Sequence, residues 1–186
     1  DKQVFSRRAP EKGLSLAQLA GLSLREGGLI VGRGSSSPLL PHLVLCAQAA
    51  EVEVDPQTGE VTLHRLAAGQ DVGFALNPSI VEGQVQGGVA QGIGFALLEQ
   101  MVFEKGAVTN PNFCDFKLPT ALDVPLIESI LIEHPSEGGP YGAKGVGEPP
   151  TVPTAAAIAN AVNAAVGARI KDLPITPQRV LEALQG

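Results

Sequence analysis

Alternation of apolar and polar residues predicts a β-hairpin in the first half of the chain. Residues 50–54 and 61–66 each alternate with the period of two that places successive side chains on opposite faces of a strand. Between them, the stretch Asp55-Pro56-Gln57-Thr58-Gly59 has the residue types of a tight turn. We therefore predict an antiparallel hairpin over residues 43–68. A further apolar stretch at 127–133 predicts another strand.

Four other segments have patterns typical of helices. Each has a capping signal or an apolar stripe, and they begin at Ser15, run from Ser79 to about Phe103, run from Pro153 to Val166, and run from Thr176 to Leu184. Ser15 and Gln18 have the spacing of a capping box. Strands and helices together predict an α+β fold, in which a mixed β-sheet carries packed helices. The loop at 109–125, interrupted by prolines, is expected to cross the domain surface.

Glycines recur four residues apart in the second predicted helix, at Gly83 and Gly87 and again at Gly88 and Gly92. On a helix this spacing gives a strip without side chains, where another backbone or a flat ligand can approach closely. Each glycine lowers helix stability by up to about 1 kcal/mol relative to alanine. We therefore expect the strip to serve packing or binding.

The domain organisation predicted from these patterns is simple. Residues 1–14 are polar and are interpreted as an N-terminal arm or connector. Residues 15–186 are interpreted as one domain. The absence of an initial Met suggests a processed chain, a trimmed chain or a fragment.

Composition excludes several classes of function. The net charge of −6 and the isoelectric point near 5.0 argue against binding to nucleic acid or to an anionic membrane surface. No apolar run reaches the length of a membrane span, and the N-terminus has no signal-peptide core. Cys46 and Cys114 have no metal-ligand spacing, so we predict no metal ligand in this chain and a cytoplasmic location with reduced thiols.

One glycine-rich turn carries the candidate chemistry, Gly142-Ala143-Lys144-Gly145-Val146-Gly147-Glu148-Pro149-Pro150. Its glycines allow backbone N–H groups to approach a ligand, and its prolines limit how far the turn can flex. A lone carboxylate beside such donors suits a general base next to an anionic cofactor. The alternative is an exposed loop with a solvated Glu148, which composition alone favours.

A second stretch, Asp71-Val72-Gly73-Phe74-Ala75-Leu76-Asn77-Pro78, follows the hairpin. Asp71 and Asn77 suit a loop whose side chains hydrogen-bond either a ligand or their own backbone. From the residues alone, the bond to their own backbone is the default interpretation.

Several short motifs follow one another between residues 43 and 184. In chain order they are Glu51-Val52-Glu53-Val54-Asp55-Pro56, Asp71-Val72-Gly73, Asn77-Pro78, Gly83-Gln84, Gln91-Gly92-Ile93-Gly94, Lys117-Leu118-Pro119-Thr120, the turn at 142–150 and Leu173-Pro174-Ile175-Thr176-Pro177. As an ordered set they resemble the C-terminal part of the molybdenum-cofactor-binding subunit of the xanthine dehydrogenase/aldehyde oxidase family of molybdenum hydroxylases.

The resemblance implies roles for particular residues. It makes Glu148 the general base beside molybdenum, and it places the backbone of Lys144, Gly145, Val146 and Gly147 against the cofactor. It also places Asp71, Asn77 and Gln84 near the pterin or its nucleotide tail, although turn-forming and capping roles fit these three equally well.

The same resemblance implies cofactors and partners. The cofactor is molybdenum with molybdopterin, in the cytosine dinucleotide form as one option. Iron–sulfur clusters and FAD are expected on partner chains or domains, and a larger molybdopterin-binding chain is expected to complete the site. The implied activity is oxidation of an aldehyde or an N-heteroaromatic, purine-like compound with water as the oxygen source. Two alternatives stay open: a non-catalytic assembly module of the same fold, and a carbon monoxide dehydrogenase-like subunit.

Overall fold

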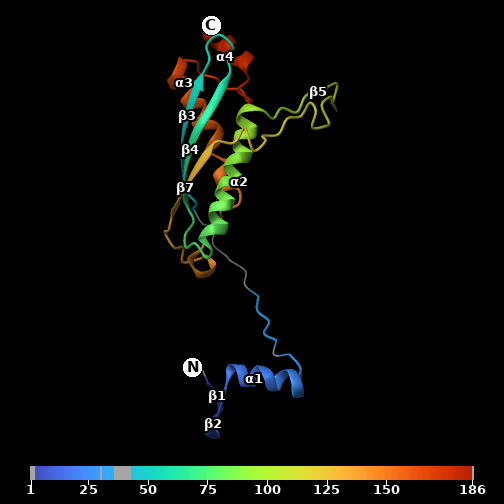
Figure 1. Cartoon of the computed structure of the whole chain (residues 1–186), viewed down its shortest axis with the longest axis vertical. Coiled ribbons are helices and arrows are strands. Elements are labelled where there is room, and N and C mark those ends of the chain that lie inside the picture. The colour runs from blue at the N-terminus through green and yellow to red at the C-terminus, as the bar shows by residue number, and fades with distance from the viewer. Residues whose placement is uncertain (1–2, 30, 36–42, 186) are drawn as a thin grey trace. The chain divides into compact units, whose positions relative to one another are not determined.

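The computed structural model describes residues 3–29, 31–35 and 43–185 and divides the chain into two units, Asp1–Ser37 and Pro38–Gly186. The elements of the first unit are β1 (Gln3–Ser6), β2 (Ala9–Ser15), α1 (Leu16–Leu22) and the π-helical turn η1 (Ser23–Gly27) (Figure 1). The predicted capping box is confirmed, because Ser15 Oγ accepts the Gln18 N–H at 3.2 Å and Gln18 Oε1 accepts the Ser15 N–H at 2.9 Å. The boundary predicted after residue 14 lies inside this unit.

A three-stranded mixed sheet with the order β3-β4-β7 forms the centre of the second unit. Its strands are β3 (Cys46–Val54), β4 (Val61–Asp71) and β7 (Leu126–Ile132). β3 and β4 are antiparallel, whereas β4 and β7 are parallel. The predicted hairpin and the predicted third strand are therefore confirmed. Gly59 closes the hairpin turn with a φ of +75°, a left-handed conformation that favours glycine.

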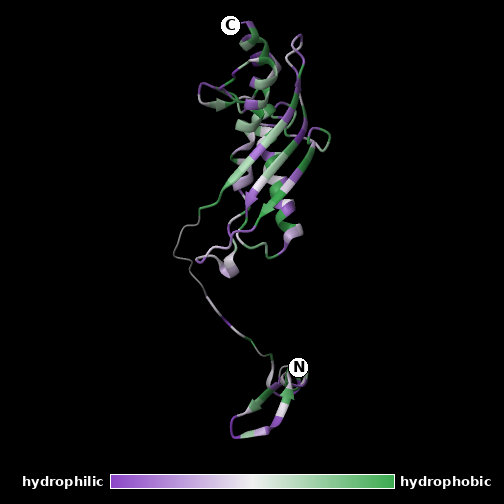
Figure 2. Ribbon diagram, turned by 90° about the vertical axis from the view of Figure 1, so that its left-hand side faces the viewer, coloured by the Kyte–Doolittle hydropathy of each residue, from purple (hydrophilic) through white to green (hydrophobic). Residues whose placement is uncertain are grey.

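The helices of this unit pack on the sheet and on one another. They are α2 (Pro78–Leu97), α3 (Thr154–Val166) and α4 (Pro177–Gln185). Exposed and inward-facing residues alternate along β3 and along the first half of β4, and Figure 2 shows hydrophilic and hydrophobic bands on the strands. The shared core consists of Leu66, Ala68, Val85, Val89, Ile93, Ala96, Ile158, Val162, Ile175 and Val180. The α+β prediction is confirmed.

The glycine strip of α2 serves close packing at Gly88 and Gly92 but not at Gly83 and Gly87. A Cβ atom added to Gly88 would lie 3.0 Å from Pro150 Cβ, and one added to Gly92 would lie 2.5 Å from Thr154 Cβ. Gly83 and Gly87 would meet nothing within 4 Å. The strip therefore brings α2 close to the segment that begins α3.

The predicted end of this helix near Phe103 is wrong, because α2 ends at Leu97. The Gly94 carbonyl accepts the N–H groups of both Leu98 and Glu99, at 2.9 and 2.8 Å, and Leu98 leaves the helical conformation. Because the backbone dihedral angles of Leu98 lie outside the α-helical range, the helix ends before this residue.

Residues 98–125 form an extension that carries the short strands β5 (Phe103–Glu104) and β6 (Ala107–Val108). The loop predicted at 109–125 has no helix or strand, but it returns from the projecting β5–β6 hairpin rather than crossing the domain surface (Figure 1). Apolar side chains on this extension are exposed, among them Phe103, Phe113 and Leu122. Within the described residues, no helix has the length and apolar character that crossing a membrane requires.

The close approach at Gly92 gives a testable prediction. Gly92→Ala is expected to lower the free energy of unfolding by about 1–3 kcal/mol, because its methyl group collides with Thr154. The matched control is Gly87→Ala on the same helix, which enters open space and is expected to stabilise by up to about 1 kcal/mol. Urea unfolding of both purified variants measures the difference. Equal midpoints would contradict the packing described for α2.

Candidate functional site

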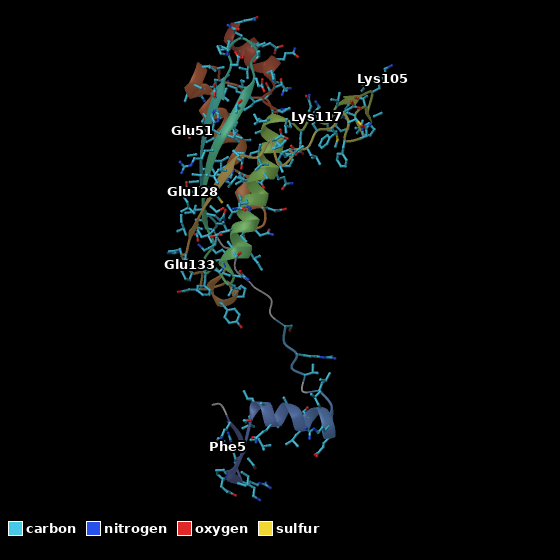
Figure 3. The ribbon with its side chains drawn as sticks, in the orientation of Figure 1. Phe5, Glu51, Lys105, Lys117, Glu128 and Glu133 are labelled. Atoms are coloured by element: carbon cyan, nitrogen blue, oxygen red, sulfur yellow. The ribbon has the colours of Figure 1, made fainter. Side chains whose placement is uncertain are left out.

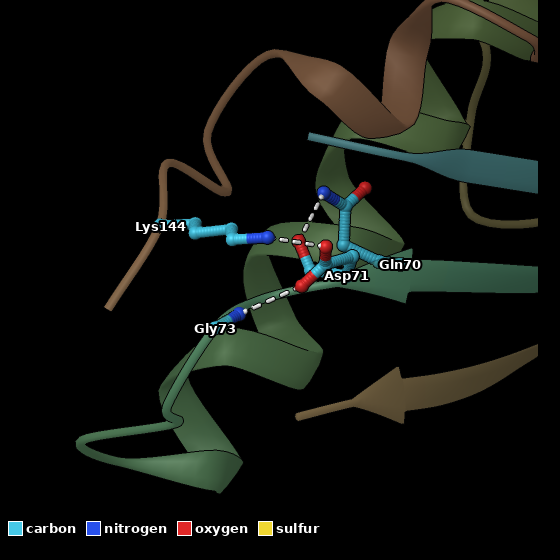
Figure 4. Close-up of polar contacts among 4 residues, drawn as sticks. All are labelled: Gln70, Asp71, Gly73 and Lys144. Carbon is cyan, nitrogen blue, oxygen red and sulfur yellow. Dashed lines mark hydrogen bonds and ion pairs between the residues drawn. The ribbon is translucent and has the colours of Figure 1, made fainter. Parts of the chain in front are cut away.

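Asp71, the last residue of β4, holds the first half of the glycine-rich turn. Its Oδ2 accepts a hydrogen bond from Lys144 Nζ at 2.6 Å, and its Oδ1 accepts the Gly73 N–H at 3.0 Å (Figure 4). The two charged side chains are only 10% and 8% exposed. The Lys144 N–H also donates to the Val72 carbonyl at 3.0 Å, so both the side chain and the backbone of Lys144 are attached to the end of β4.

The ion pair sets the charge of Asp71. Burial by itself acts to raise the pKa of the Asp71 carboxyl, but the hydrogen bonds from Lys144 and the Gly73 N–H, with the positive charge of Lys144, outweigh it. The pKa therefore lies below the ordinary value of an aspartate. Asp71 is ionised at neutral pH, and both of its oxygens are already engaged within the chain.

Glycines make this attachment possible. Gly73 has a φ of +69°, and a Cβ atom there would lie 2.2 Å from the Gly142 carbonyl oxygen. That same carbonyl accepts the N–H of Phe74 at 3.0 Å. Glu133, which follows β7 (Figure 3), accepts the Ala75 N–H at 2.8 Å. The end of β4 and the glycine-rich turn are thus joined by close backbone contact.

Four consecutive backbone donors follow Lys144. Within the described residues, the N–H groups of residues 145–148 donate to no acceptor of the chain. Gly145 has open space where a Cβ would be, and Gly147 would meet only Gln84 Oε1, at 3.7 Å. A run of free N–H groups on a backbone in which every second residue is glycine fits an anionic ligand.

The second half of the turn is attached to three other elements. The Pro150 carbonyl accepts hydrogen bonds from Gln48 Nε2 of β3 at 2.6 Å and from Thr154 Oγ1 of α3 at 3.0 Å. Thr151 Oγ1 donates to the Gly88 carbonyl of α2 at 3.1 Å. Pro149–Thr151 form the 3₁₀ turn η3, whose N-cap is Glu148.

Glu148 lies between the two attached parts of the turn, Lys144 on one side and Pro150 with Thr151 on the other. Its carboxylate has no partner among the described residues, neither a hydrogen-bond partner nor an ion-pair partner, and the side chain is exposed. It lines a cavity of about 480 Å³ whose other residues are Val44, Leu45, Cys46, Pro149, Val152 and Pro153. An acid whose cavity is otherwise mostly apolar, and which has no internal partner, can take a proton from a bound molecule.

A larger cavity, of about 800 Å³, lies on the other side of Leu45 and Cys46. Its lining includes Asp71 and Lys144 but not Glu148. Cys46, whose thiol donates to Gln70 Oε1 at 2.9 Å, is a lining residue of both cavities. Burial raises the pKa of this thiol, so it is the less reactive protonated form at neutral pH. We therefore place the candidate chemistry in the smaller cavity.

Gln84 and Asn77, the other two predicted cofactor contacts, differ in what they contact within the chain. Gln84 is exposed on α2 and lies beside Gly147, so it joins the turn. Asn77 caps α2, because its Oδ1 accepts the Ile80 N–H at 3.3 Å. Its default interpretation as a backbone cap is therefore seen directly, and no hydrogen bond among the described residues connects it to Glu148. Among the described residues, no group of three or more His, Cys, Asp or Glu could hold a metal ion.

Sequence patterns missed Gln48 and Thr154. The signal for Gln48 is its position, since it occupies an inward-facing place on β3 between Cys46 and Ala50, where an apolar residue is expected. Thr154 gives a weaker signal, because a threonine near a helix start is usually interpreted as a cap.

The chain resembles known proteins in sequence and in fold. Residues 1–125 match the family described as "Molybdopterin cofactor-binding domain". The chain is 46% identical over 184 residues to a putative xanthine dehydrogenase molybdenum-binding subunit of Escherichia coli K12, covering 96% of this chain and 24% of that protein. The chain thus spans about a quarter of the length of that relative.

The solved structures that resemble the chain include those of two enzymes. A Cu,Mo-CO dehydrogenase in its carbon monoxide reduced state is 30% identical with a TM-score of 0.79, covering 98% of this chain and 24% of that one. Quinoline 2-oxidoreductase from Pseudomonas putida 86 is 39% identical with a TM-score of 0.70, covering 74% and 18%. These relatives are oxidoreductases, and the resemblance stated from the sequence is confirmed. The chain belongs to the molybdopterin cofactor-binding domain family and corresponds to a molybdenum-binding part of the xanthine dehydrogenase and aldehyde oxidoreductase group.

Proposed function

We propose that this chain supplies the general base and one wall of the cofactor site in a molybdenum hydroxylase. The enzyme oxidises an aldehyde or an N-heteroaromatic compound and takes its oxygen from water. The observation that carries the proposal is the Glu148 carboxylate in a cavity of about 480 Å³, at the end of a run of four backbone N–H groups, all without a partner among the described residues.

The residues of the turn fit the implied cofactor. The N–H groups of residues 145–148 and the open space at Gly145 suit anionic oxygen or sulfur atoms on molybdopterin. Gln84, beside Gly147, offers a side-chain amide to the same ligand. Lys144 contributes through its backbone, because its ammonium is engaged by Asp71. Asp71 holds the turn, and Asn77 is proposed as a contact to the nucleotide tail.

The chemistry that molybdenum with molybdopterin supplies when bound is acceptance of the electrons released by the substrate. Glu148 removes the proton from the oxygen that attacks the substrate carbon, and the cavity around it is lined mostly by apolar residues. A carboxylate serves this purpose at neutral pH because its ionised form has a free oxygen to accept the proton.

Analysis of the intact enzyme tests the proposal. The chain, purified with the chains that accompany it, is expected to contain stoichiometric molybdenum and pterin, and acid hydrolysis is expected to release cytidine monophosphate. Iron, acid-labile sulfide and FAD are expected on partner chains. Purification without molybdenum or pterin would overturn the proposal and would favour a non-catalytic assembly module.

A carbon monoxide dehydrogenase-like activity is the second candidate, since a Cu,Mo-CO dehydrogenase matches 98% of the chain with a TM-score of 0.79. The same metal analysis separates the candidates. Molybdenum without copper, together with aldehyde or heteroaromatic turnover, supports the hydroxylase. Stoichiometric copper with oxidation of carbon monoxide supports the second candidate.

A further inference from the structure

The carbonyl of Pro150 receives two side-chain hydrogen bonds, which is unusual for a backbone group in a turn. Gln48 Nε2 donates at 2.6 Å and Thr154 Oγ1 donates at 3.0 Å. A carbonyl oxygen has two lone pairs, and here both are used. Pro150 is buried and stands two residues after Glu148, so these bonds fix the backbone immediately beyond the proposed base.

The two donors come from elements that are firmly packed. Gln48 is the third residue of β3, and α3 packs directly on β3. Thr154, the first residue of α3, has no exposed surface. The donors therefore tie the turn to the sheet and to a helix at the same point.

The chain on either side of Glu148 differs in stiffness. Gly145 and Gly147 precede it, and glycine permits many backbone conformations. Pro149 and Pro150 follow it with φ held near −65°. Fixing the Pro150 carbonyl therefore fixes the position of the Glu148 backbone, from which the side chain extends. The glycines before Glu148 would by themselves leave this position variable.

Satisfying a buried carbonyl would not by itself call for Gln48. One donor is enough for that purpose, and Thr154 supplies it. Gln48 moreover buries its own Oε1 without a partner among the described residues, which costs stability. A methionine or leucine at position 48 would avoid this cost.

We propose that Gln48 and Thr154 are positioning residues for catalysis, which hold the Pro150 carbonyl so that Glu148 points at the reacting oxygen. This inference rests on the proposed role of Glu148 as the base. Displacement of a catalytic group by about 1 Å can lower turnover by up to about 100-fold. Loss of either donor is therefore expected to affect kcat and to leave substrate binding intact.

The test uses Gln48→Met, Thr154→Val and Thr154→Ser in the intact enzyme with its partner chains. The first two are expected to lower kcat about tenfold with KM, molybdenum content and pterin content unchanged. Thr154→Ser keeps the hydroxyl and is expected to restore kcat. Thr176→Val is the matched control, since Thr176 Oγ1 accepts the Arg179 N–H at 3.3 Å at the start of α4, far in sequence from the turn. It is expected to lower the melting temperature and to leave kcat unchanged.

Several results would overturn the inference. Wild-type kcat in both Gln48→Met and Thr154→Val would do so, as would an equal loss of kcat in Thr176→Val. Should Thr154→Val fail to fold, Gln48→Met carries the test, because methionine has nearly the same length and also removes the unpaired Oε1. Failure of the proposed function gives a different pattern, in which Glu148→Gln itself keeps its turnover.

Discussion

Glu148→Gln is expected to abolish measurable turnover in the intact enzyme while molybdenum and pterin contents stay normal. Glutamine has nearly the same shape, but its neutral amide cannot take the proton that the reaction releases. Loss of a general base lowers the rate by about 10²–10⁴-fold. Because the Glu148 carboxylate has no partner among the described residues, its neutralisation breaks no internal bond. The melting temperature should therefore change little.

Glu137→Gln is the matched control for this substitution. Glu137 is also exposed near the turn, but it lines the larger cavity and not the cavity of Glu148. Its variant is expected to retain wild-type kcat. Steady-state kinetics and metal analysis on both variants separate loss of the base from loss of the cofactor. Turnover retained in Glu148→Gln would remove Glu148 from the mechanism.

Lys144→Met is expected to have the largest effect on stability. It leaves the Asp71 carboxylate, only 10% exposed, without its counter-ion. Breaking a buried ion pair from one side lowers the free energy of unfolding by about 3–5 kcal/mol. Asp71→Asn combined with Lys144→Met removes both charges and is expected to recover most of that loss. Chemical unfolding of the single and double variants measures the coupling.

The exposed pair on the same sheet provides the comparison. Arg65 of β4 is bonded to Glu128 of β7, which is labelled in Figure 3, but their side chains are 54% and 46% exposed. Glu128→Gln is expected to change the free energy of unfolding by less than about 1 kcal/mol. Equal effects of Glu128→Gln and Lys144→Met would show that burial does not set the strength of the Asp71 pair.

The Asp71 pair also predicts a dependence on pH. The pKa of Asp71 is lowered in the folded chain, whereas an unfolded aspartate has a pKa of about 3.9. The stabilisation is therefore fully present above the unfolded value and is lost as pH falls through the lower folded value. Acid unfolding of the double variant should lack this contribution.

Local patterns predicted the elements well because their signals are contained in adjacent residues. The alternation in residues 50–54 and the turn at 55–59 specify the hairpin without reference to other parts of the chain. The end of α2 could not be predicted in the same way. The apolar pattern continues past Leu97, and the double hydrogen bond to the Gly94 carbonyl has no sequence signal.

The candidate site was predictable in part. The turn at 142–150 was identified from its residues and from the order of motifs around it. The engagement of Asp71 by Lys144 was not foreseen, because these residues are 73 positions apart and meet only through the fold. The hydrogen bond from Gln48 to the Pro150 carbonyl joins residues 102 positions apart, and it was missed for the same reason.

The parallel pairing of β4 with β7 has a consequence for the order in which the chain folds. The β3–β4 hairpin closes through a short turn. The pairing of β4 with β7 instead brings together strands that are separated by residues 72–125. Non-local pairing of this kind is slow, since the entropy of the intervening segment is lost before contacts form. The turn that carries Glu148 follows β7 in the chain and is joined to β3, β4, α2 and α3. We therefore expect the turn to be among the last parts to fold. In a newly made chain, the β3-β4-β7 sheet is expected to form before Glu148 reaches its final position.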